Sequence, residues 1–156
     1  MSSRVGVVVF PGTNCELDVV RALGALGGDA RTVWHGESSL EDLDAVVIPG
    51  GFAHGDYLRT GAIARFSPVM DAVATFAAAG GPVVGICNGF QVLTEAGLLP
   101  GALGKNEHLR FICRDVDLRV ETTTTPLTHG VAAGSVLRIP VNHFEGNYVC
   151  DHDTLT

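Results

Sequence analysis

The sequence predicts an α/β fold: a doubly wound, mostly parallel sheet with helices on both faces. Short runs that are apolar on both faces alternate with stretches of helical character, as in sheets that are covered on both sides. Glycines, 20 of the 156 residues, cluster beside these runs, where tight turns between strands and helices require them. The length is that of one domain, so we expect a single domain over residues 1–156.

Four apolar runs are predicted to be strands, because each is short and lies next to Gly, Pro or another turn residue. They are Val5–Phe10, Ala30–Trp34, Ala45–Ile48 and Val83–Ile86. Three helices are predicted, which are Glu16–Leu26, Val69–Ala79 and Gly89–Ala96.

Start and stop signals flank these helices. We expect Asn14 or Thr13 to cap the first helix, and Ser67-Pro68 to begin the second. Glycines follow all three helices and are expected to end them.

The second half of the chain has a different pattern. Residues Asp115–Glu121 alternate between polar and apolar, which is typical of an antiparallel or edge strand with one wet face. Val136–Val141 is the candidate partner. We therefore expect an antiparallel edge in the second half.

Composition excludes several classes of protein. The formal net charge is −7 and the only lysine is Lys105, so no basic face is available for nucleic acid. No apolar run approaches the roughly 20 residues that span a bilayer, and Val5–Phe10 is too short for the core of a signal peptide. The four cysteines form no C-x-x-C pair, so we expect no metal site, free thiols and a cytoplasmic location.

The strongest chemical signal is the turn that contains Cys87. A buried strand runs into Cys87 and a helix begins at once, with Gly85 two residues before it and Gly89 two residues after it. This is the nucleophile-elbow pattern with Cys in place of Ser, in which glycines avoid collisions with the neighbouring strand and helix. The thiol would lie at a helix N-terminus, which favours the thiolate, and the Asn88 N–H would face an oxyanion. The alternative is an ordinary turn with a core cysteine.

A second glycine loop, Pro49-Gly50-Gly51-Phe52, follows a different strand. Its backbone N–H groups can approach an oxyanion, and acyl transfer uses donors from two loops. The alternative is a simple turn.

These two motifs, in this order, resemble class I glutamine amidotransferase domains. Further segments are similar to the glutaminase subunits of phosphoribosylformylglycinamidine synthase, a purine-biosynthesis family, and the resemblance covers nearly the whole chain. The segments are Phe10–Cys15, Pro49–Phe52, Gly55–Arg59, Gly61–Ala64, Gly85–Gln91, Leu98–Leu103, Asn106, Phe111–Arg114 and His143–Tyr148.

The resemblance implies a flavodoxin-like fold and a glutaminase. Cys87 would be the nucleophile, Gly51 and Asn88 the oxyanion donors, and Gly50, Gln91 and His143 substrate-binding residues. The ammonia would pass to a synthetase subunit that makes formylglycinamidine ribonucleotide, in a complex with a small accessory subunit. ATP and Mg²⁺ would belong to the synthetase, so no cofactor is expected on this chain.

The sequence departs from the family pattern in one respect. The family uses a His-Pro-Glu motif for the catalytic base, and no such motif occurs here. His35 and His143 have a Glu two residues on, but we expect neither to replace that base, and we expect His54 to be a surface variation. We therefore expect a truncated domain with an incomplete sheet and very low glutaminase activity on its own.

Three alternatives stay open. The chain is a natural short form that acts as a binding or scaffold subunit, or it is another member of the superfamily that carries a cysteine elbow. The third is redox sensing by Cys87, which requires a resolving thiol that the sequence does not place.

Overall fold

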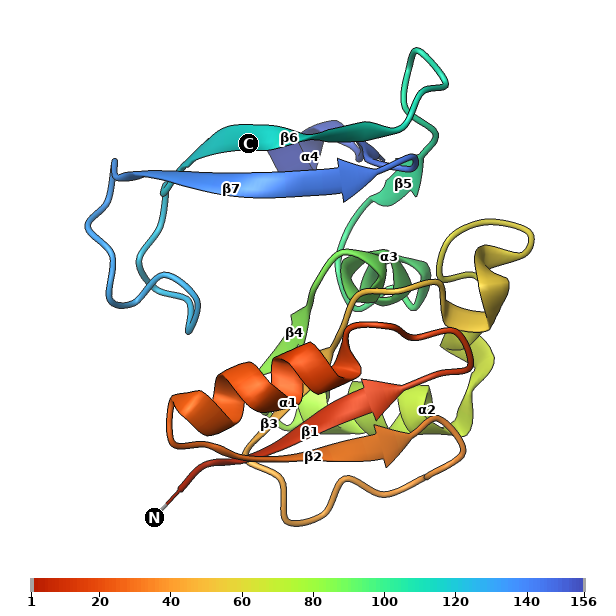
Figure 1. Ribbon diagram of the computed structural model, residues 1–156, viewed down its shortest axis with the longest axis vertical. Helices are drawn as coiled ribbons and strands as arrows, with labels where there is room; N and C mark the ends of the chain where they lie inside the picture. The colour runs from red at the N-terminus through yellow and green to blue at the C-terminus, as the bar shows by residue number, and fades with distance from the viewer. Residues whose placement is uncertain (1, 156) are drawn as a thin grey trace. The chain divides into compact units, whose positions relative to one another are not determined.

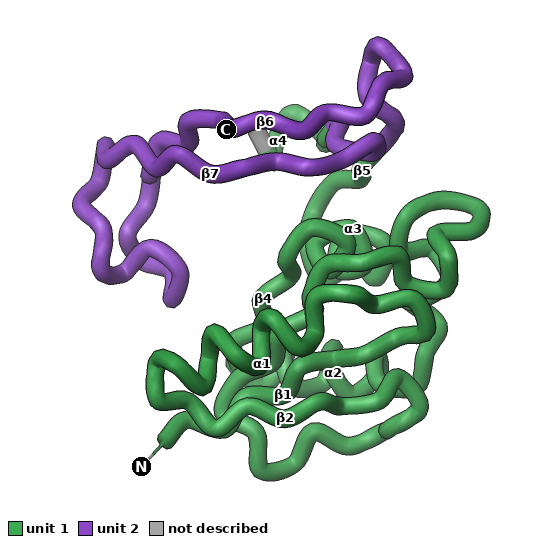
Figure 2. Tube along the Cα trace, in the orientation of Figure 1, with its two compact units in different colours: residues 1–103, 148–156 green, residues 104–147 purple. Residues whose placement is uncertain are grey.

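The structure is a computed structural model that describes residues 2–155 (Figure 1). The chain divides into two compact units, one of residues 1–103 and 148–156 and the other of residues 104–147 (Figure 2). Each unit is described by itself. The expectation of a single domain stays a prediction.

A four-stranded parallel sheet forms the centre of the first unit. Its strand order is β2-β1-β3-β4, so the chain runs from the central β1 to one edge and then returns to the other side of β1. At such a reversal of strand order, the carboxyl ends of the strands border a crevice that commonly binds ligands. The strands are β1 (Arg4–Val9), β2 (Asp29–Trp34), β3 (Ala45–Ile48) and β4 (Val83–Gly85).

Helices cover both faces of this sheet. Helix α1 (Glu16–Ala25) lies in front of β1 and β2, and α2 (Pro68–Ala78) lies behind them (Figure 1). Helix α3 (Asn88–Glu95) packs on β3 and β4, and two short 3-10 helices, η1 (Ala53–Asp56) and η2 (Ala64–Phe66), follow β3. The predicted doubly wound α/β fold is confirmed. The buried cluster includes Val8, Phe10, Val33, Val46, Ile48, Val69, Val73 and Val92.

The predicted start of α2 is confirmed, with Ser67 at the N-cap position and Pro68 as the first helical residue, whereas the predicted caps of α1 are wrong. The residue before α1 is Cys15, which makes no side-chain cap bond, and the Thr13 hydroxyl accepts a hydrogen bond from the Phe10 N–H instead. Ser67 does precede α2, but its hydroxyl lies between two histidines and makes no cap bond. The Thr13 hydroxyl is used in a local bond within the turn after β1, and the Ser67 hydroxyl is used in tertiary contacts with His35 and His54.

The second unit contains an antiparallel ribbon. Strand β6 (Ile112–Arg119) pairs with β7 (Val136–His143), which confirms the predicted partner. The predicted single wet face is wrong, because Val116 is only half-buried and Leu118 is 48% exposed. Two strands alone cannot supply the second layer that buries a face.

Short elements complete the described chain. Strands β5 (Ala102–Gly104) and β8 (Asn147–Val149) form a separate two-stranded pair, and α4 (His152–Leu155) follows. Among residues 2–155, no helix has the length and apolar character needed to cross a membrane.

Candidate active site

Cys87 occupies a sharp turn between β4 and α3. Strand β4 ends at Gly85 and α3 begins at Asn88, so only Ile86 and Cys87 connect them. Cys87 has φ 53° and ψ −111°, a backbone conformation that a residue with a side chain rarely adopts. The Ile86 N–H donates to the Ile48 carbonyl at 2.9 Å, and the Phe90 N–H donates to the Cys87 carbonyl at 3.0 Å. This turn leaves the Cys87 side chain exposed at the N-terminus of α3.

The two glycines around Cys87 have no room for a side chain. A Cβ atom at Gly85 would lie 2.7 Å from the Gly89 backbone and 2.7 Å from Leu93 Cδ1. A Cβ atom at Gly89 would overlap the Ile48 carbonyl oxygen of β3. The close approach of α3 to β3 and β4 therefore depends on glycine at both positions.

The Gly50–Gly51 loop lies against the Cys87 turn. The point where a Cβ of Gly50 would stand is 3.4 Å from Cys87 Cβ. The loop is held from its other side, because the N–H groups of Asn14 and Cys15 donate to the Gly50 carbonyl at 3.3 and 3.1 Å. The ends of β3 and β4 and the segment after β1 thus meet at one place.

Two backbone amides beside Cys87 are available to a ligand. Within residues 2–155, neither the Gly51 N–H nor the Asn88 N–H donates a hydrogen bond to a protein acceptor. The Asn88 amide is in the first turn of α3, where the helix dipole adds positive potential. The two N–H groups can therefore stabilise an oxyanion that forms next to the Cys87 sulfur.

The Asn88 side chain links the start of α3 to the loop after β3. Its Oδ1 accepts from the Ala53 N–H at 2.9 Å, and its Nδ2 donates to Asp56 Oδ1 and to Gln91 Oε1, both at 3.0 Å. Asp56 Oδ1 also accepts from the Gly61 N–H at 3.2 Å. Asn88 is only 3% exposed, so this network is a buried brace between α3 and the loop after β3.

Sequence reasoning missed Asp56 as part of the site. The residue lies in the Gly55–Arg59 segment that carries the family resemblance, and its position beside Gly-rich turns gave no indication of a contact with Asn88. Gln91, predicted to bind substrate, is buried and is held by Asn88.

An ion pair fixes the same loop at its other end. Arg59 donates from Nε and Nη2 to the two carboxylate oxygens of Glu95, at 2.6 and 2.7 Å. The Glu95 side chain is only 9% exposed, and this bidentate geometry ties the loop to the end of α3.

Two histidines of the first unit, His35 and His54, contact Ser67. Ser67 Oγ lies 3.3 Å from His35 Nδ1 and 3.3 Å from His54 Nε2, and the two imidazole rings are 5.2 Å apart. Burial lowers the pKa of His54 below its ordinary value, and the nearby His35 lowers it further. This arrangement favours neutral His54 and engages it with Ser67, not with Cys87.

His143 belongs to the second unit. Its Nδ1 lies 3.0 Å from Asn106 Oδ1, and the same oxygen accepts from the Gly146 N–H at 3.0 Å. The predicted site residues Gly50, Gly51, Asn88 and Gln91 gather around Cys87, whereas His143 stays a prediction from the resemblance.

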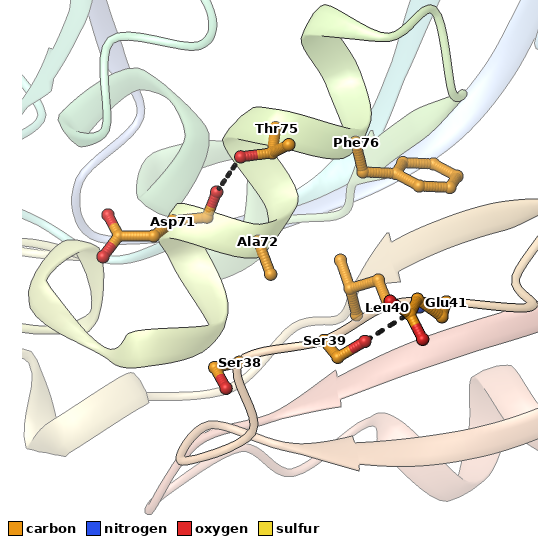
Figure 3. Close-up of a pocket in the computed structure, with 8 residues that line it drawn as sticks. All are labelled: Ser38, Ser39, Leu40, Glu41, Asp71, Ala72, Thr75 and Phe76. Atoms are coloured by element: carbon orange, nitrogen blue, oxygen red, sulfur yellow. Dashed lines mark hydrogen bonds between the residues drawn. The ribbon is translucent and has the colours of Figure 1, made fainter.

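The structure also contains pockets away from Cys87. One pocket lies between Ser38–Glu41 and α2 (Figure 3), where Thr75 Oγ1 donates to the Asp71 carbonyl at 2.9 Å and the Glu41 N–H donates to Ser39 Oγ at 3.3 Å. It contains none of the predicted site residues. Among the described residues, no group of three or more His, Cys, Asp or Glu could hold a metal ion.

Comparison with known families decides the membership of the chain. Residues 2–156 match the profile of the CobB/CobQ-like glutamine amidotransferase domain. The chain belongs to this family. The match covers the β4–α3 turn, the Gly50–Gly51 loop and the β6–β7 ribbon.

Individual relatives are consistent with this membership. The chain is 59% identical to phosphoribosylformylglycinamidine synthase subunit PurQ of Koribacter versatilis, over 97% of this chain and 66% of that protein. It is 58% identical to the subunit PurQ of a Synechococcus species, over 97% of this chain and 68% of that protein. The chain therefore spans about two thirds of the length of these relatives.

A solved structure shares the fold closely. The chain matches a chain of "Structure of PurLQS from Thermotoga maritima" with a TM-score of 0.93 and 43% identity. The match covers 98% of this chain and 72% of that one.

Proposed function

We propose that this protein is a glutaminase subunit that hydrolyses glutamine to glutamate and supplies ammonia to a synthetase. The observation that carries the proposal is the exposed Cys87 thiol, held at the N-terminus of α3 beside two unpaired backbone amides. Family membership and the PurQ relatives support glutamine as the substrate.

The chemistry follows from this arrangement. The Cys87 thiolate adds to the side-chain amide carbon of glutamine, and the carbonyl electrons move to the oxygen. The N–H groups of Gly51 and Asn88 stabilise that oxyanion. Collapse forms a thioester and expels the nitrogen, which takes up a proton and leaves as ammonia. Water then cleaves the carbon–sulfur bond and releases glutamate.

Other residues position the substrate. Gly50 leaves space beside the Cys87 side chain, and the buried Gln91 holds the Asn88 carboxamide that braces the loop. We assign His143 a substrate-binding role on the family resemblance. We assign no catalytic base, because the two histidines that face Ser67 have no contact with Cys87 among the described residues.

The acceptor of the ammonia is proposed from the relatives. Their name points to the synthetase that converts formylglycinamide ribonucleotide to formylglycinamidine ribonucleotide, with a small accessory subunit as the third component. ATP and Mg²⁺ would bind the synthetase, so this chain works without a cofactor of its own. We place the complex in the cytoplasm.

The test uses the protein expressed from its own gene together with its synthetase. Cys87→Ala lowers glutamine-dependent synthesis by on the order of 10³-fold or more, because no other group can form the thioester. Synthesis from added ammonia stays at the wild-type rate. Cys113→Ala, which removes an exposed thiol from β6, is the matched control and leaves both rates unchanged.

Two results contradict the proposal. Glutamine use that survives in Cys87→Ala shows that Cys87 is not the nucleophile. A wild-type complex that uses ammonia but never glutamine shows that the protein serves as a scaffold subunit.

A further inference from the structure

We propose that Cys15 and Cys87 form a reversible, peroxide-driven disulfide across Gly50, with Cys87 as the oxidised thiol and Cys15 as the resolving thiol. The disulfide itself rests only on the geometry of the two cysteines. The loss of glutaminase activity that it causes rests on the proposed function.

Gly50 brings the two side chains together. The point where its Cβ would stand is 3.5 Å from Cys15 Sγ and 3.4 Å from Cys87 Cβ. Glycine leaves this point empty, so both cysteine side chains border one small unfilled space. A Cβ at position 50 would contact both cysteine side chains.

The backbone holds both cysteines at this space. The Cys15 N–H donates to the Gly50 carbonyl at 3.1 Å, which fixes the start of α1 against the loop. Cys87 is held by the bonds of the β4–α3 turn. The disulfide requires rotation of two short side chains, whereas the chain segments that carry them are already adjacent.

The two thiols have unequal environments. Cys87 is exposed at the N-terminus of α3, so a small hydroperoxide reaches it from solvent. Cys15 is half-buried, and burial raises the pKa of its thiol, with further contributions from Asp18, Cys87 and Glu16. Cys15 is thus protonated at rest, so we expect the exposed Cys87 to be oxidised first and Cys15 to give up its proton as it attacks the Cys87 sulfur.

The chemistry balances with a hydroperoxide as the oxidant. The Cys87 thiolate attacks hydrogen peroxide, forming an S–O bond, breaking the O–O bond and releasing hydroxide. The Cys15 sulfur then attacks the Cys87 sulfenic acid. An S–S bond forms, the S–O bond breaks, and the leaving oxygen takes up the Cys15 proton and departs as water. Two thiols have lost two electrons and peroxide has been reduced to water.

The disulfide would protect the nucleophile. A sulfenic acid without a resolving partner proceeds to sulfinic acid, which thiol reductants do not reverse. A disulfide blocks Cys87 only until it is reduced.

The experiment treats the purified chain with hydrogen peroxide in the presence of dimedone, which traps sulfenic acid. We expect wild-type protein to lose the mass of two hydrogen atoms and to yield a peptide that links residues 15 and 87. Dithiothreitol reverses both changes. In Cys15→Ser, dimedone labelling of Cys87 rises about tenfold or more, because the resolving step is absent. Cys150→Ser is the matched control and behaves as wild type.

Equal dimedone labelling of Cys87 in wild type and Cys15→Ser overturns the proposal, as does a link from Cys87 to Cys113 or Cys150. The mass readout needs no catalytic activity, so it separates this proposal from the proposed function. If the disulfide forms while glutamine use by the full complex is unaffected, the proposed function fails and the disulfide stands.

Discussion

The Cys87 site and the β6–β7 ribbon differ in how their polar groups are held in position. At the site, loops after β1, β3 and β4 are held to one another by backbone bonds and by the buried Asn88. In the ribbon, backbone pairing is regular but most side chains on both strands are exposed. The comparison indicates that position at the site comes from close packing and polar bracing, whereas the ribbon is held within its own unit mainly by backbone pairing and by exposed side-chain contacts.

The ion pairs of the two regions differ in the same way. Glu95 pairs with Arg59 while almost buried, whereas the Asp115–Arg138 pair across β6 and β7 is well exposed at 3.0 Å. Exposed pairs contribute little because water already solvates both charges. The predictions below test this difference, beginning with the largest effect.

The first prediction concerns the packing of the elbow. Gly89→Ala places a Cβ on the Ile48 carbonyl oxygen, so we expect a loss of at least about 3 kcal/mol in unfolding free energy. Gly24→Ala, on α1 with no atom near the new Cβ, is the matched control and gains about 0.5 kcal/mol. Urea unfolding of both variants measures the difference. Similar midpoints for the two would contradict the steric account.

The second prediction compares an apolar side chain from each region. Val46→Ala removes a fully buried side chain of β3, and we expect a cost of about 2–3 kcal/mol from lost burial and the cavity. Leu118→Ala on the ribbon, although it removes more atoms, costs less than about 1 kcal/mol because Leu118 is half-exposed. The reverse order in urea unfolding would show that the ribbon, and not the sheet, is the better-packed region.

The third prediction compares a polar pair from each region by double-mutant cycles. Asp56→Ala with Asn88→Ala gives a coupling energy of about 1–2 kcal/mol, since the Asn88 amide loses a buried acceptor. Asp115→Ala with Arg138→Ala gives less than about 0.5 kcal/mol in the same measurement. Equal couplings would remove the distinction between the buried brace and the exposed pair.

The smallest expected effect is a dependence of stability on pH. The pKa of His54 in the folded protein lies below its ordinary value of 6.5, so the unfolded chain takes up the proton first as pH falls. The stability that neutral His54 contributes is present above pH 6.5 and is lost as pH falls through the folded-state pKa. We expect His54→Gln to reduce the change of the urea midpoint with pH between pH 5 and pH 7.5, roughly the range in which histidine titrates. The same dependence of the urea midpoint on pH in wild type and His54→Gln would show that His54 does not contribute to it.

Much of the sheet and the elbow could be predicted from sequence. The strands of the first unit are short apolar runs next to turn residues. The Gly-x-Cys-x-Gly spacing is typical of a sharp turn between a strand and a helix that pack closely. Asp56 and Cys15 could not be placed, because their contacts with Asn88 and Gly50 depend on how three loops meet after folding. The ribbon's exposure was also missed, since alternation in one strand does not say whether a second layer covers it.

The most direct test of the Cys87 site is labelling with a diazo-ketone analogue of glutamine, followed by peptide mass mapping. The account predicts one adduct, on Cys87, that forms more slowly when glutamine is added, because the analogue must occupy the site before it reacts. Cys113 is also an exposed thiol and provides the internal comparison on the same chain. Labelling of Cys113 at the same rate as Cys87, or labelling of Cys87 that glutamine does not slow, would contradict the account.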